Sequence, residues 1–134
     1  FWKDNMRGVM EKYKNVFSLG DAAASPNSKT AAAVRKQAPV VTRNIQNLIA
    51  GGAVEEKYDG YASCPLTTAY GKVLMAEFIY GGKPTPTLPL DPAKERRVNW
   101  IIKKTGLPIF YWDYMLKGHI AFPVHNTSFV DPGA

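Results

Sequence analysis

One cysteine is the residue of this 134-residue sequence whose type is best suited to covalent chemistry. Cys64 stands between Ser63 and Pro65, and a proline disfavours the helical conformation in the residue before it. Cys64 should therefore lie on extended backbone with its thiol directed off the strand. The alternative is a small buried hydrophobe, the commoner state of a lone cysteine. A disulfide within the chain is excluded, because there is no second cysteine.

A second group of candidate residues surrounds a Gly-Asp turn. Gly20 and Asp21 follow a short apolar segment, and Ser28, Lys29 and Thr30 stand where a helix is expected to begin. An aspartate carboxylate accepts hydrogen bonds from sugar-like hydroxyls, and the unpaired N–H groups of a first helical turn favour an anion. The structural alternative is an ordinary turn and a capped helix with a solvated lysine.

Two elements are expected to hold this turn, a strand over 16–19 and a helix over 30–50. A four-residue strand needs neighbours. The helix is predicted from one stripe of apolar residues at helical spacing, with Asn27 or Ser28 as its cap. Pro39 predicts a kink or a break. The stripe consists of Val34, Ala38, Val41, Ile45 and Leu48.

The second half of the chain predicts an antiparallel hairpin followed by two helices. Strands over 61–70 and 72–80 meet near Gly71. The second strand is apolar on both faces, which predicts that both faces are covered. Asp91 is a suitable cap for a helix over 92–104. Gly106 should end that helix, before a short aromatic helix over 107–116.

Composition limits the partners. The net charge of +6 indicates an acidic partner or an anionic surface. No RNA-binding signature and no Cys/His zinc pattern is present, so we expect neither nucleic acid nor a metal. No run approaches the roughly 20 apolar residues of a membrane-spanning helix.

Five segments together resemble the C-terminal part of the sulfide:quinone oxidoreductases, which are FAD-dependent members of the disulfide-reductase superfamily. They read NVFSLGD, SKTAAAV, YDGYASCPLTTAYGKVLMAEF, DPAKER and LPIFYWDYMLKG. The resemblance covers residues 15–118 and is most specific at 61–65. It implies an α+β fragment of a two-Rossmann-domain flavoprotein. Residues 1–52 would end the FAD-binding domain, and residues 53–134 would form the hairpin and a membrane-facing helical region.

The resemblance implies roles for the candidate residues. Cys64 would be one of two redox cysteines, and would carry sulfur as a persulfide or pass electrons to the flavin. Asp21 would contact the ribityl chain of FAD, with Gly20 beside it in the cofactor site, and Ser28, Lys29 and Thr30 would lie near the pyrimidine end of the flavin ring. The second cysteine and the pyrophosphate-binding GxGxxG turn are expected upstream of residue 1. The chain alone should therefore be inactive and should lack FAD.

The aromatic C-terminal helix is the expected contact with membrane and quinone. The family places its membrane anchor and quinone entry in this region, so the resemblance implies that Phe110, Tyr111 and Trp112 dip into lipid. Phe78, Tyr80 and Phe110 are the candidates for lining a quinone pocket. The alternative is a helix that completes the core. We expect a peripheral membrane protein that acts on sulfide and quinone. Surface normally covered by the missing N-terminal part predicts self-association, including a homo-oligomer.

Two other functions remain open from the sequence. The first is another flavoprotein of the same superfamily, such as a type II NADH:quinone reductase. Cys64 discriminates against it, because NADH oxidation needs no such thiol. The second is a membrane-surface or oligomerisation module without chemistry.

Overall fold

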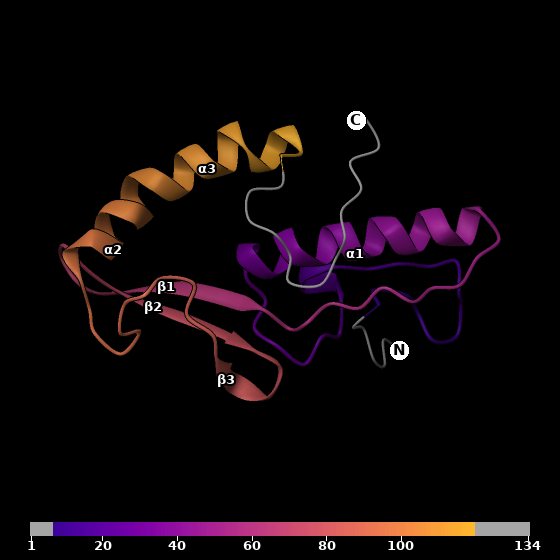
Figure 1. The fold of residues 1–134 in the computed structure, drawn as a ribbon, viewed down its shortest axis with the longest axis horizontal. Coiled ribbons are helices and arrows are strands. Elements are labelled where there is room, and N and C mark those ends of the chain that lie inside the picture. Colours follow the sequence, from indigo (N-terminus) through magenta and orange to yellow (C-terminus); the bar gives the residue numbers. More distant parts are fainter. Residues whose placement is uncertain (1–6, 120–134) are drawn as a thin grey trace.

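An antiparallel hairpin with helices packed against both of its strands forms the centre of the fold (Figure 1). In the computed structural model, which describes residues 7–119, β1 (Ala62–Ala69) pairs with β2 (Lys72–Ile79). The short β3 (Lys83–Pro84) adds to β2, so that the strand order is β1-β2-β3. The predicted hairpin and the α+β class are confirmed.

The long helix α1 (Ala31–Ile49) is also confirmed. Its N-cap is Thr30, whose hydroxyl oxygen accepts the N–H of Ala33 at 3.2 Å, so the predicted cap at Asn27 or Ser28 is wrong. Pro39 lies inside the helix without interrupting it. The break considered at that residue is therefore excluded.

The buried face of α1 differs from the predicted apolar stripe. Of that stripe only Val41 is buried, while Val34, Ala38, Ile45 and Leu48 remain partly exposed. The reason is that the buried face of α1 carries polar side chains that form hydrogen bonds with neighbouring loops. The spacing of residues along the helix cannot distinguish such buried polar residues from solvent-exposed ones. The buried residues are Ala33, Lys36, Gln37, Val40, Val41 and Asn44.

Asn44 joins three segments of the chain. Its side chain is 0% exposed. Its Nδ2 donates to the carbonyl oxygens of Arg7 at 2.8 Å and Glu56 at 2.9 Å, and its Oδ1 accepts the N–H of Glu56 at 3.0 Å. The side-chain amide of Asn44 therefore holds two segments against the middle of α1. One is the N-terminal segment at Arg7, and the other is the segment after the helix at Glu56.

The predicted strand over 16–19 is reduced to one isolated antiparallel bridge between Val9 and Phe17. A tight turn, in which the N–H of Val16 donates to the carbonyl of Tyr13, reverses the chain just before the bridge. The segment then enters a 3-10 turn at Gly20–Ala22. Its pairing partner, Val9, therefore lies within this chain, and this bridge needs no further strand.

The C-terminal elements form one continuous helical run. α2 (Arg97–Ile101) passes through a π-helical turn (Ile102–Gly106) into α3 (Leu107–Asp113). The expected stop at Gly106 is wrong. Pro108 has no N–H and its ring would clash with the carbonyl four residues earlier, and a wider π turn relieves that clash.

The predicted start at residue 92 is also wrong. Asp91 caps a turn instead, with its Oδ1 accepting the N–H of Ala93 at 3.0 Å. The carbonyl of Asp91 accepts the N–H of Lys94 at 3.3 Å, and the helix begins only at Arg97. The predicted helix cap at Asp91 is therefore wrong: Asp91 closes a turn, and the N-cap of α2 is Arg96.

Replacing Asn44 should destabilise the fold strongly. Asn44→Ala leaves two carbonyls and one N–H without their partner, which should lower the free energy of unfolding by about 2–4 kcal/mol. Asn47→Ala is the matched control, because Asn47 lies on the exposed side of the same helix. It should change that free energy by about 0.5 kcal/mol or less. Urea denaturation followed by circular dichroism measures both, and equal effects of the two variants would contradict the role of Asn44.

Candidate functional site

A groove lies between the loop before α1 and the end of β2. Its volume is about 480 Å³, within the size range of small-molecule sites. It brings together Ser28, predicted to face a flavin, and Phe78, predicted to line a quinone pocket. Its lining residues are Ser25, Pro26, Asn27, Ser28, Phe78, Ile79, Gly81 and Gly82.

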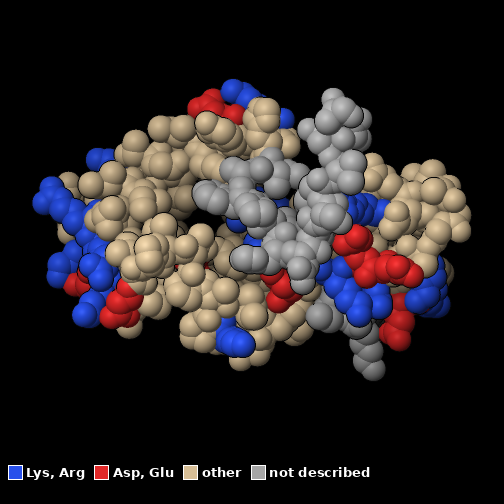
Figure 2. Space-filling model, viewed as in Figure 1, with Lys and Arg blue, Asp and Glu red and all other residues tan. Residues whose placement is uncertain are grey.

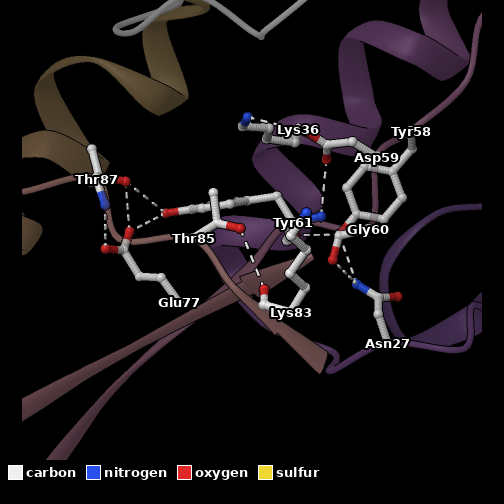
Figure 3. Close-up of polar contacts among 10 residues, drawn as sticks. All are labelled: Asn27, Lys36, Tyr58, Asp59, Gly60, Tyr61, Glu77, Lys83, Thr85 and Thr87. Carbon is white, nitrogen blue, oxygen red and sulfur yellow. Dashed lines mark hydrogen bonds and ion pairs between the residues drawn. The ribbon is translucent and has the colours of Figure 1, made fainter. Parts of the chain in front are cut away.

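Side chains of the loop are hydrogen-bonded to the segment that enters β1. Asn27 Nδ2 donates to the Tyr58 hydroxyl at 2.7 Å and more weakly to the carbonyl of Gly60 at 3.4 Å (Figure 3). Ser25 Oγ lies 3.3 Å from the Tyr80 hydroxyl and also bonds to Asn27 Oδ1. The position of the loop is therefore set by residues more than 30 positions further along the chain.

Tyr80 packs directly on a glycine. Gly60 has φ +83°, and a Cβ atom there would lie 2.4 Å from Cγ of Tyr80. The Tyr80 ring also meets the Tyr58 ring edge-on, with 5.7 Å between centroids. Only glycine permits both this backbone conformation and this contact.

The Tyr58 hydroxyl connects the loop to β1. It accepts from Asn27 and donates to the carbonyl of Tyr61. Burial is the main cause that raises the pKa of Tyr58 above its usual value of 10.0, and the charges of Tyr80 and Asp59 raise it further. The phenol therefore keeps its proton, and hence its donor role, throughout the neutral range.

A second polar cluster holds the other side of this segment (Figure 3). The buried Glu77 carboxylate accepts from the Tyr61 hydroxyl at 2.5 Å, and from the hydroxyl and N–H of Thr87 at 2.7 and 2.8 Å. Lys36 Nζ lies 4.7 Å from the Tyr61 ring centroid and 3.6 Å from a carboxylate oxygen of Asp59. Burial and then the bond to Glu77 raise the pKa of Tyr61.

Cys64 lies on β1 as a free, half-buried thiol, on the extended backbone that the sequence predicts. Cys64 pairs with Ala76, and Ala62, two residues before Cys64 on the same strand, pairs with Phe78. Because alternate residues of a strand share a face, Cys64 and Phe78 lie diagonally on one face of the sheet. The thiol is thus placed beside a residue that lines the groove.

Backbone atoms of the Gly-Asp turn form hydrogen bonds with two side chains, one on α1 and one just before it. The N–H of Gly20 donates to Gln37 Oε1 at 2.7 Å, and Lys29 Nζ donates to the carbonyl of Asp21 at 2.6 Å. Asp21, Ser28 and Lys29 are exposed, whereas Thr30 serves as the helix cap. The structure therefore gathers the predicted cofactor residues at one end of α1.

The aromatic candidates separate into two places. Tyr80 lies at the end of β2 close to Ser25 of the groove loop. Tyr111 and Trp112 lie on α3 and are 42% and 64% exposed. Phe110 is half-buried and lies under the guanidinium of Arg35 on α1, at 5.9 Å, so it faces inward.

The helical run exposes many apolar residues and borders a basic region. Lys and Arg gather at the end of the molecule that carries the hairpin turn and α2 (Figure 2). Exposed basic residues there are Lys72, Lys94, Arg97 and Lys104. The exposed apolar residues of the run are Val98, Ile101, Leu107, Ile109, Tyr111, Trp112, Tyr114 and Leu116.

Two negative findings concern residues 7–119. None of the helices in this range is long and apolar enough to cross a membrane. No group of three or more His, Cys, Asp or Glu side chains in the same range is arranged to hold a metal ion.

Sequence reasoning missed the side chains that fix the site. Tyr58, Asn27 and Glu77 received no functional role, although a glutamate in an otherwise apolar strand is a usable signal of a buried polar cluster. Asn27 was predicted only as a helix cap. Its actual partners lie 31 and 33 residues away, beyond the reach of any local pattern.

Comparison with known proteins agrees with the resemblance seen in the sequence. The chain is 50% identical over 107 residues to the mitochondrial sulfide:quinone oxidoreductase of Dictyostelium discoideum, covering 80% of this chain. It is 42% identical to the mouse protein of that name over 91% of this chain, and 39% identical to that of Schizosaccharomyces pombe over 79%. No protein-family model matches the chain.

The fold also occurs in a solved structure. A chain in the cryo-EM structure of the Tetrahymena thermophila mitochondrial ATP synthase F1Fo tetramer aligns with a TM-score of 0.78 and 26% identity. The alignment covers 90% of this chain and 29% of that one.

The chain spans only 24%, 28% and 24% of the lengths of these three curated relatives. By sequence, it is homologous to a segment, about a quarter of the full length, of the sulfide:quinone oxidoreductases.

Proposed function

We propose that this chain is part of an enzyme that oxidises sulfide through Cys64 and a flavin and passes the electrons to a quinone. The observation that carries the proposal is the 50% identity to a protein named for that activity. The geometry supports it, because Cys64 shares a sheet face with Phe78, which lines the groove beside Ser28.

Cys64 would act with a second cysteine that lies outside this chain. Hydrosulfide would attack the disulfide between the two, breaking its S–S bond and leaving a persulfide on one sulfur and a thiolate on the other. We assign the persulfide to Cys64. The sulfane sulfur then leaves to a nucleophilic acceptor, and the two cysteine thiols return to the disulfide by giving up two electrons.

FAD would supply the two-electron acceptor in this cycle. The exposed donors at the start of α1 fit such a group, because Ser28 lines the groove and Lys29 is held beside Asp21 by the backbone. A lysine and a helix N-terminus favour the negative charge of a reduced flavin ring. Asp21 is exposed and free to accept from hydroxyls of the ribityl chain.

The helical run would place the enzyme on a membrane surface, where quinone is dissolved. Its exposed apolar residues include Tyr111, Trp112 and Tyr114 and lie next to basic residues, a composition typical of interfacial helices on anionic lipid. The rest of the protein would cover the half-exposed apolar residues of α1. A homo-oligomer through such surfaces is part of the same proposal.

Neither of the two rival functions would require Cys64. A type II NADH:quinone reductase would need no thiol at this position. A membrane-surface module without chemistry would need neither the thiol nor the groove.

Cysteine replacement in the full-length enzyme tests the proposed chemistry. Cys64→Ala should lower sulfide-dependent quinone reduction by about a thousandfold or more, because the sulfur can no longer be held covalently. Ser63→Ala is the matched control, since Ser63 is the adjacent residue and points to the opposite face of β1. Full activity in Cys64→Ala, or reduction of quinone by NADH but not by sulfide, would contradict the proposal.

Sedimentation with vesicles of phosphatidylcholine and anionic phosphatidylglycerol tests the membrane contact. Ile109→Ser should weaken binding by about tenfold, because it removes an apolar side chain from the surface that enters the lipid. Ile49→Ser is the control, an isoleucine 81% exposed on α1 instead of α3. Equal loss of binding in both variants, or no binding by the unaltered chain, would argue against this surface.

A further inference from the structure

Lys103 reaches from the helical run to the strand that carries Cys64. Its Nζ donates to the carbonyl oxygen of Pro65 at 2.7 Å and to Thr67 Oγ1 at 2.8 Å. Pro65 is the residue directly after Cys64. The ammonium group is therefore bonded to the backbone one peptide away from the thiol.

The sheet edge explains why this carbonyl is available. β1 is an edge strand of the sheet in the described residues, and proline is tolerated there when its missing N–H faces outward. The N–H and C=O of one residue point to the same side of a strand. The carbonyl of Pro65 thus points away from β2, and in the described residues it is bound by Lys103 instead of by a neighbouring strand.

The lysine belongs to the π-helical turn between α2 and α3. Upstream of this turn, the run is fixed to β2, since Asn99 Nδ2 donates to the carbonyl of Val73 at 3.1 Å and Arg96 bridges the same residue. Downstream of it lies α3 with its exposed aromatic residues. Lys103 is consequently the contact by which the turn before α3 holds β1.

We infer that Lys103 is a positioning residue for Cys64, and that it couples the helical run to the reactivity of the thiol. This inference rests on the proposed function for its meaning in catalysis. A purely structural role, in which Lys103 only blunts the sheet edge, would alter overall stability without a specific effect on Cys64.

The alkylation rate of Cys64 by iodoacetamide, measured by mass spectrometry on the reduced full-length protein under native conditions, separates the two roles. Cys64 is the one cysteine of these 134 residues, so the peptide that contains it reports its modification separately from that of any other cysteine. Lys103→Met should accelerate alkylation about fivefold or more, because the strand around the thiol opens locally more often. Lys103→Arg should return the rate to within about twofold of the original, since a guanidinium can donate to both acceptors.

Two further variants serve as controls. Lys104→Met changes an exposed neighbouring lysine and should leave the rate unchanged. Asn44→Ala destabilises the fold through contacts of α1, and should accelerate alkylation less than Lys103→Met despite a larger fall in melting temperature. An unchanged rate in Lys103→Met, or an equal rise in Asn44→Ala, would overturn the inference.

Should Lys103→Met fail to fold, Thr67→Val replaces it. That variant removes one of the two acceptors and should give a smaller acceleration in the same direction, whereas no acceleration would overturn the inference. Alkylation requires neither flavin nor sulfide. A failed assay of sulfide oxidation would therefore count against the proposed function and leave this result intact.

Discussion

The hydrogen bonds made by the buried polar side chains of α1 are the constraint on which the rest of the structure depends. Gln37 binds the backbone of the Gly-Asp turn, and Asn44 binds the segments at Arg7 and Glu56. Lys36 pairs with Asp59 at the entry to β1. Long irregular segments on both sides of α1 are thereby held in place, and they carry the loop of the groove and the approach to Cys64.

Local pattern predicted the regular elements and failed where a distant residue decides the outcome. The helical period of apolar residues was sufficient to predict α1, and the two strands that meet near Gly71 were sufficient to predict the hairpin. The proline after Cys64 was sufficient to predict extended backbone there. The inner face of α1 was assigned wrongly, because Lys36 and Asn44 look like solvated residues until their partners are known. The stop at Gly106 failed because Pro108, two residues later, is accommodated by widening the helix and not by ending it.

The candidate site shows the same division. The identity of Cys64 and of the residues at the start of α1 could be taken from the sequence through its resemblance to a family. The groove that joins Ser28 to Phe78 could not, because it depends on the contacts among Asn27, Tyr58 and Tyr80 across the fold. The sequence placed Cys64, Ser28 and Phe78 on separate elements. The fold places Phe78 on one sheet face with Cys64 and in one groove with Ser28.

The measurement that tests the central claim most directly is the intact mass and visible absorption spectrum of the complete gene product, purified without added flavin. The account predicts a protein several times longer than this chain, yellow as isolated, with a flavin band that sulfide bleaches. A colourless product of the same length as this chain would contradict it, because Cys64 would then have no flavin to reduce.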